Sequence, residues 1–311
     1  MQFRKDPYLF LLSTSIVCYQ LTVPLPTPAE HYILSNRITL HCLDYGGTGP
    51  TLVLLHGLTA NAHAFDGVLE AGLLQQARVI SVDLRGRGLS SMPAFGYAMQ
   101  DHAADIIGLL NAMGLSKVIL GGHSFGGLLS CYLAALYPER VERVIMLDAA
   151  ARLNHRAAEM LGPAISRLDK RFDSFDVYLD KIKSAPYLEF WDDAMLSYYK
   201  ADIKELEDGS VTPRPVLSHI YESSIGVANV AWNVMMRRVK VPVLLLYASS
   251  DYNLGERLVP ESYVEETLEL ITHSVGQAVP GNHQTMLYGR GATAIARAIT
   301  AFIHPVPEPA P

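Results

Sequence analysis

Gly122-His123-Ser124-Phe125-Gly126 is the stretch that says most about the fold of this 311-residue chain. An apolar strand pattern at 117–120 precedes it, and a helical pattern at 128–137 follows it. A tight turn between a strand and a helix exposes a serine hydroxyl but crowds the backbone, so small residues are needed two positions on either side. The spacing therefore predicts that Ser124 is a nucleophile held at the end of a buried strand.

Outward from this turn, strand and helix patterns alternate along the chain. Apolar strand patterns lie at 52–55, 78–82, 117–120, 144–147, 243–246 and 274–279, and helical patterns lie at 101–113, 128–137 and 292–303. An N-terminal hairpin, made of 31–35 and 38–45, is expected to turn at Asn36-Arg37. The alternation predicts an α/β fold with a mostly parallel, doubly wound central sheet that helices cover on both faces.

A stretch of about ninety residues between 147 and 243 interrupts this alternation. It contains helical patterns and many aromatic residues but no buried-strand run. Connections of this length inside a compact sheet are usually functional insertions. We therefore predict a helical cap at 151–238, inserted between two parts of an α/β core at 31–150 and 239–304.

The predicted cap contains the candidates for the substrate pocket. Trp191 and Tyr198 lie in an aromatic segment with helical spacing, and one side of that segment is expected to face Ser124. We predict that Trp191 or Tyr198 lines an acyl pocket for an apolar or aromatic group. The alternative is that both side chains pack inside the cap.

The composition argues against several classes of protein. The chain has 25 basic and 31 acidic residues and a net charge of −6, which excludes a nucleic-acid binder that relies on a strongly basic face. Its three cysteines, Cys18, Cys42 and Cys131, cannot make a disulfide framework, and no cysteine–histidine cluster indicates a metal site. We expect a small-molecule substrate and no bound metal.

The two ends of the chain are expected to lie outside the core. Residues 1–30 form an N-terminal arm whose apolar run resembles a secretory signal, but Asp6 and Pro7 interrupt it and no small-residue cleavage site follows. The run is too short to span a bilayer as a helix. The alternative to a signal is an arm that packs on the body or on a second subunit. If the protein is a homodimer, we expect the arm or the cap to form the interface. The expected location is cytoplasmic, or exported if 1–30 acts as a signal, and 305–311 form a proline-rich tail.

A serine nucleophile needs a base and donors for the oxyanion. His283, which follows the last strand pattern and precedes the closing helix, is the candidate base, and His273 is the alternative. The backbone N–H of Phe125, directly after the serine, is one candidate donor to the tetrahedral intermediate. The N–H of Leu58, after the His56-Gly57 dipeptide, is the other.

The acid that orients the imidazole should also follow a strand. Asp251, in the loop after the strand pattern at 243–247, is the candidate. Asp148 directly follows the strand pattern at 144–147 and is the alternative. Either aspartate could instead cap a helix.

Together these motifs resemble the α/β-hydrolase superfamily, in the branch with a helical cap after the sixth strand. The matching pieces are HGL at 56–58, DLRGRGLS at 83–90, GHSFGG at 122–127, SSD at 249–251 and GNH at 281–283. They follow the family's order of serine, acid and histidine. The resemblance covers residues 31–303, with Ala248 at a position where relatives usually have glycine.

The resemblance implies a serine hydrolase that forms an acyl-enzyme and needs no cofactor. Its expected substrate is a carboxylic ester, or a lactone or amide, that is small and partly apolar. An epoxide hydrolase or dehalogenase of this fold would carry aspartate at position 124. A carbon–carbon bond hydrolase or an acyltransferase could use the same triad, although His123 stands where carbon–carbon bond hydrolases often have asparagine. A ligand receptor that retains the triad is a further alternative.

Overall fold

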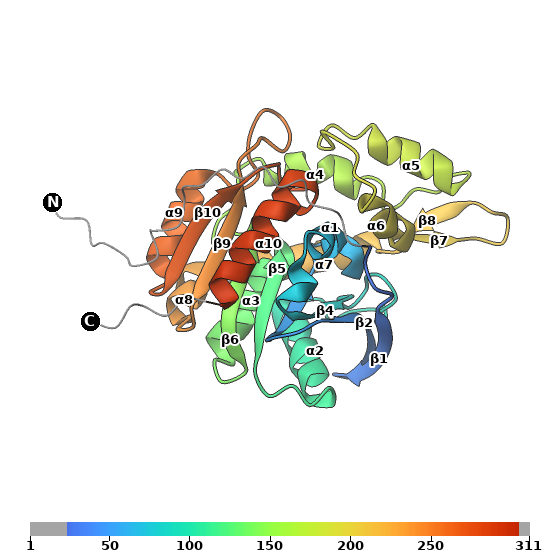
Figure 1. Ribbon diagram of the computed structural model, residues 1–311. Coiled ribbons are helices and arrows are strands. Elements are labelled where there is room, and N and C mark those ends of the chain that lie inside the picture. Colours follow the sequence, from blue (N-terminus) through green and yellow to red (C-terminus); the bar gives the residue numbers. More distant parts are fainter. Residues whose placement is uncertain (1–23, 305–311) are drawn as a thin grey trace, which may run out of the picture.

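The computed structural model describes residues 24–304, which are built around an eight-stranded sheet (Figure 1). Its strand order is β1-β2-β4-β3-β5-β6-β9-β10. These strands are β1 (Ala29–Ser35), β2 (Ile38–Gly46), β3 (Thr51–Leu55), β4 (Arg78–Val82), β5 (Val118–His123), β6 (Val141–Leu147), β9 (Val243–Ala248) and β10 (Ser274–Val279). The β1–β2 and β2–β4 pairs are antiparallel, and the other pairs are parallel. The prediction of a mostly parallel central sheet in an α/β fold is confirmed.

The N-terminal hairpin turns where the sequence predicts. Ser35 pairs with Ile38, which leaves Asn36 and Arg37 as the two central residues of the turn. Their φ angles of 47° and 66° are both positive, as a two-residue turn of type I′ requires. The hairpin places β1 at one end of the strand order.

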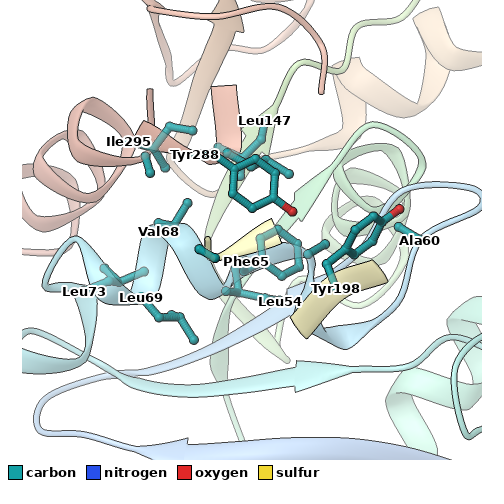
Figure 2. Packing of buried hydrophobic residues seen from close by; sticks show 14 of the residues in the cluster. Leu54, Ala60, Phe65, Val68, Leu69, Leu73, Leu147, Tyr198, Tyr288 and Ile295 are labelled. Atoms are coloured by element: carbon teal, nitrogen blue, oxygen red, sulfur yellow. The ribbon is translucent and has the colours of Figure 1, made fainter. Parts of the chain in front are cut away.

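Helices cover both faces of the sheet because successive side chains of a strand point to opposite faces. Leu52 and Leu54 of β3 pack in one apolar cluster with α1 (Asp66–Glu70) and α10 (Gly289–Ile303). Val53 and Leu55 pack in the other cluster, to which α2 (Met99–Ala112), α3 (Phe125–Leu136), α8 (Trp232–Arg238) and α9 (Glu261–Leu270) contribute. Figure 2 shows part of the first cluster, with Leu54, Phe65, Val68, Leu69 and Ile295.

The connection between β6 and β9 is long and mostly helical. It holds α4 (Ala157–Ile165), α5 (Phe175–Lys183), α6 (Met195–Asp202), β7 (Ile203–Glu205), β8 (Val211–Pro213), α7 (Leu217–Ala228) and α8. The β7–β8 hairpin was not apparent from the sequence because each strand has only three residues. Trp232 of α8 packs edge-on against Tyr132 of α3, with ring centroids 6.4 Å apart. The end of this connection therefore returns to the core, and the division into a cap at 151–238 and a core stays a prediction.

The predictions for the two ends of the chain fall mostly outside the part that the structure describes. Residues 1–23 of the arm and 305–311 of the tail lie outside it. Among the helices within 24–304, none is both long enough and apolar enough to span a membrane.

Candidate active site

Ser124 lies on the turn between β5 and α3, as the sequence predicts. Its φ of 52° is in the left-handed region, which is uncommon for a residue with a side chain. The turn has room only for glycine on both sides. A Cβ on Gly122 would lie 2.2 Å from the carbonyl carbon of Gly126, and a Cβ on Gly126 would lie 1.8 Å from the oxygen of Leu55. This close packing holds Ser124, which remains partly exposed, at the carboxyl end of β5.

Two backbone N–H groups lie beside the serine. Phe125 begins α3, and the N–H groups in the first turn of a helix have no acceptor within the helix. Leu58 follows β3, and the Cβ position of its neighbour Gly57 is 3.8 Å from the Cβ of Ser124. Neither N–H donates a hydrogen bond within residues 24–304. Both are therefore available to a substrate oxygen.

His283 and Asp148 form a buried hydrogen-bonded pair. The distance between His283 Nδ1 and Asp148 Oδ2 is 2.6 Å, and the two side chains are 6% and 2% exposed. An ionised carboxylate only accepts hydrogen bonds, so Nδ1 carries the proton and Nε2 keeps a lone pair for a second partner. The other carboxylate oxygen, Asp148 Oδ1, accepts the N–H of Ala248 at 2.9 Å. Both oxygens of the acid are thus held in place.

The prediction that Asp251 is the acid partner of His283 is wrong. Asp251 is exposed, whereas the next residue, Tyr252, is buried. Asp148 takes the position because β6 is the direct neighbour of β5, whereas β9 is one strand farther away. The last residues of β5 and β6, His123 and Leu147, are paired, so the residues that follow them emerge next to each other. The sequence signal is an aspartate directly after an apolar strand, which is the alternative stated above.

Aromatic rings enclose the imidazole of His283. The Tyr252 ring meets it edge-on with centroids 5.4 Å apart, and the His123 ring lies 4.5 Å away. His123 Nε2 donates to the carbonyl oxygen of His283 at 2.8 Å. Burial lowers the pKa of His123 well below its ordinary value, so its ring stays neutral beside the candidate base. Sequence reasoning missed Tyr252, although it directly follows the aspartate that was expected to be the acid.

The two predicted pocket residues pack against aromatic neighbours. Tyr198 is 4% exposed, and its ring meets that of Tyr199 edge-on at 4.7 Å. Figure 2 shows Tyr198 in the same apolar cluster as Phe65 and Ala60. The half-buried Trp191 stacks on the Tyr199 ring with centroids 5.9 Å apart. The assignment of Trp191 or Tyr198 to an acyl pocket stays a prediction.

A different residue of the predicted cap approaches the histidine. Tyr187 stacks on Tyr252 with ring centroids 5.4 Å apart, and Tyr252 in turn contacts His283. The carbonyl oxygen of Tyr187 accepts the side-chain N–H of Asn282 at 2.9 Å. Tyr187 therefore belongs to the surroundings of His283. The aromatic segment at 187–191 is the signal in the sequence that points to it.

A groove of about 880 Å³ lies beside this site rather than over it. Its lining is mostly apolar and comes from α3, the loop after Asp148, α7, α8 and the residues between them, and α9. The residues are Leu128, Ala150, Ala151, Arg152, Leu153, Ser224, Val227, Ala228, Val230, Ala231, Trp232, Asn233, Arg237, Glu266, Glu269 and Leu270. Ser124 and His283 are not among them.

Within residues 24–304, no group of three or more His, Cys, Asp and Glu side chains is arranged to hold a metal ion.

Comparison with known families and curated proteins gives consistent matches. The model of the family described as alpha/beta hydrolase fold matches residues 50–283. A 2-(acetamidomethylene)succinate hydrolase of Mesorhizobium japonicum is 34% identical over 149 residues, 47% of this chain and 53% of that protein. An esterase of Mycobacterium tuberculosis is 30% identical over 169 residues, 52% of this chain and 55% of that protein. The chain thus spans about half the length of these two curated relatives.

Solved structures match over a larger part of the chain. The crystal structure of an E-2-(acetamidomethylene)succinate hydrolase has a TM-score of 0.78 and 27% sequence identity, and the match covers 89% of this chain and 99% of that one. An enol-lactonase from Burkholderia xenovorans has a TM-score of 0.66 and 21% identity, covering 88% of this chain and 99% of that one. At that identity, the second likeness shows only a shared fold.

Proposed function

Because the chain belongs to the α/β-hydrolase fold family, we propose that it is a serine hydrolase whose catalytic triad is Ser124, His283 and Asp148. The observation that carries this proposal is the buried pair of His283 Nδ1 and Asp148 Oδ2, 2.6 Å apart, next to the strand end that bears Ser124. The names of the relatives, which are hydrolases, support the same class of enzyme.

The proposed mechanism assigns one role to each group. His283 Nε2 takes the proton of Ser124 Oγ as this oxygen attacks the carbonyl carbon of the substrate. Asp148 keeps the imidazole in the required tautomer and stabilises the imidazolium that forms. The N–H groups of Leu58 and Phe125 donate to the oxyanion of the tetrahedral intermediate. The leaving group then takes the proton from His283, and water, activated by the same histidine, releases the acid from the acyl-enzyme.

The proposed substrate is a carboxylic ester, lactone or amide of a small and partly apolar acid. One relative is named for 2-(acetamidomethylene)succinate, which contains an amide, and another is named an esterase. Two tyrosine rings, those of Tyr187 and Tyr252, pack towards His283. These rings support a substrate with some apolar surface. Serine at position 124, in place of the aspartate of epoxide hydrolases with this fold, argues against epoxide opening.

Other proteins of this fold could use the same triad for a different outcome. An acyltransferase would pass the acyl group of the acyl-enzyme to an added alcohol or amine, so the ratio of ester or amide to free acid among the products distinguishes it. A carbon–carbon bond hydrolase would instead cleave the bond between a carbonyl carbon and a neighbouring carbon of a ketone substrate, so hydrolysis of such a ketone distinguishes it. A receptor would turn over slowly and keep a stable covalent adduct.

Replacement of the nucleophile tests the proposal directly. Ser124→Ala is expected to abolish hydrolysis of p-nitrophenyl acetate and butyrate, because the loss is chemical, while the far-UV circular dichroism spectrum stays that of the wild type. A fluorophosphonate should label the wild type once, at Ser124. His273→Ala, which changes an exposed histidine, is the matched control and should retain activity. Unchanged hydrolysis by Ser124→Ala, or labelling at another residue, would show that the assignment is wrong.

A further inference from the structure

We propose that Arg87 is a positioning residue for the oxyanion-binding loop, and that its guanidinium places a positive charge directly behind the oxyanion site. The inference rests on the proposed serine hydrolase function. Arg87 lies in the loop after β4, and its side chain is 0% exposed. Its Nε–H donates to the carbonyl oxygen of Leu58 at 2.9 Å. Leu58 is the residue whose N–H is a candidate oxyanion donor.

The guanidinium of Arg87 is buried without a counter-ion. Its other hydrogen bonds go to neutral oxygens, the carbonyl of Arg85 at 2.8 Å and the hydroxyl of Ser223 at 2.9 Å. Among the described residues it forms no ion pair, whereas its neighbour Arg85 is paired with Asp105 at 2.5 Å. Burial lowers the pKa of Arg87 to about 10, so the side chain is still a cation at neutral pH.

A buried charge without a partner is costly, and apolar replacements of similar size are often more stable. The rule that buried charges are paired therefore has an exception at this position. Such exceptions concentrate at functional sites, where the field of the charge is used. The nearby buried carboxylate of Asp83 accepts the backbone N–H groups of Ala62 and Leu89 and forms no ion pair with Arg87, so the guanidinium has no direct counter-charge among the described residues.

Arg87 contacts both residues that carry the candidate oxyanion donors. It holds Leu58 through the carbonyl, and its Cζ lies 5.9 Å from the centroid of the Phe125 ring. Fixing the carbonyl of Leu58 restricts rotation of the turn that presents the N–H of the same residue. The cation and the two N–H groups are then held in place before the substrate arrives, which is the condition for strong stabilisation of a developing negative charge.

The effect should appear in the transition state and not in substrate binding. The carbonyl oxygen of a bound ester is nearly neutral, whereas the oxygen of the tetrahedral intermediate carries a full charge. A fixed positive charge therefore lowers the barrier more than it strengthens ground-state binding, and its removal should lower kcat with little change in KM.

The test compares Arg87→Met and Arg87→Lys with the wild type. Methionine fills similar volume without charge, so Arg87→Met should fold and lower kcat on p-nitrophenyl acetate by about 100-fold, the loss typical of one oxyanion donor. Its KM should stay within about twofold. The affinity for phenylboronic acid, which forms a tetrahedral anionic adduct with the serine, should fall in parallel with kcat. Arg87→Lys keeps the charge and should recover part of kcat.

Ser223→Ala is the matched control, because it removes one hydrogen bond of Arg87 and leaves the bond to Leu58. Its kcat should stay within about threefold of the wild type.

Two outcomes would overturn the inference. One is a kcat of Arg87→Met within about threefold of the wild type. The other is a parallel loss of kcat and melting temperature in Arg87→Met and Ser223→Ala. If Arg87→Met does not fold, Arg87→Lys tests the inference in its place. A kcat and a boronate affinity equal to those of the wild type in Arg87→Lys would overturn the positioning role of the guanidinium. A wild type that fluorophosphonate does not label overturns the proposed function as well, whereas a labelled wild type with an unimpaired Arg87→Met overturns only this inference.

Discussion

Two residues of the candidate triad have unusual backbone conformations. Ser124 and Asp148 have φ angles of 52° and 47°, in a region that residues with side chains rarely adopt. Both directly follow the last residue of a parallel strand, and the two strands are neighbours. A positive φ at a strand end turns the side chain away from the strand direction. Local strain of this kind is typical of functional sites, where the surrounding structure maintains it.

The identity of the acid can be tested by replacing each aspartate with its amide. Asp148→Asn should lower kcat by about four orders of magnitude, because an amide can stabilise the wrong imidazole tautomer. Asp251→Asn changes an exposed side chain and should leave kcat within about threefold of the wild type. Both are measured as steady-state rates on the same ester. A more severe loss in Asp251→Asn would mean that the loop after β9 moves to supply the acid.

At the scale of elements, the turn between β5 and α3 is set by close backbone packing. Gly126 lies in the first turn of α3, against the end of β3, and a Cβ there would lie 1.8 Å from the oxygen of Leu55. The contact brings α3 near enough to the sheet for Ser124 to stand at its carboxyl edge. Glycine is required here by the distance between two backbones, not by its φ angle.

Two glycine-to-alanine substitutions in helices distinguish the effect of this close backbone contact from the effect of helix propensity. Gly126→Ala should destabilise the protein by more than about 3 kcal/mol or prevent soluble expression, because backbone must move to relieve the contact. Gly162→Ala in α4 meets no atom within 4 Å and should stabilise the protein by about 0.5–1 kcal/mol. Urea unfolding of both variants gives the comparison. Equal stabilities would show that the turn tolerates a side chain.

At the scale of the whole molecule, several histidines are buried in the neutral form. Burial lowers the pKa of His56 to about 4 and those of His102 and His123 well below their ordinary value. The contacts of His56 agree with this direction: its Nε2 accepts the N–H of Leu84 at 3.0 Å and therefore has no room for a proton. Unfolding exposes these rings to water, where they bind protons near pH 6.5.

The free energy of unfolding should therefore fall as the pH is lowered from about 6.5 towards 4. In this window the unfolded chain binds more protons than the folded one, so stability rises with pH. His56 alone accounts for about 3 kcal/mol across these 2.5 units. Urea unfolding at pH 7.0, 5.5 and 4.5 measures the slope, and His102→Leu should make it shallower because one of the three groups is removed. A slope that is the same in wild type and variant would contradict this account.

Much of the fold could be predicted because its signals are local. The apolar runs at 52–55, 78–82 and 144–147 became strands, since a buried parallel strand needs apolar side chains on both faces. Asn36 and Arg37 turn the hairpin because their own φ angles define the turn. The short hairpin β7–β8 gave no comparable signal because three residues are too few for a period to appear.

The residues of the candidate site also fall into two groups, those that local sequence predicts and those that only the tertiary structure identifies. The sequence by itself determined the turn that carries Ser124, because the steric need for Gly122 and Gly126 is built into five consecutive residues. It also limited the acid to aspartates that follow apolar strands. Only the tertiary structure decided between Asp148 and Asp251, and only it placed Arg87 behind Leu58. The reason is that these contacts depend on which strands are neighbours in the sheet and where their loops meet, and spacing along the chain does not contain that order.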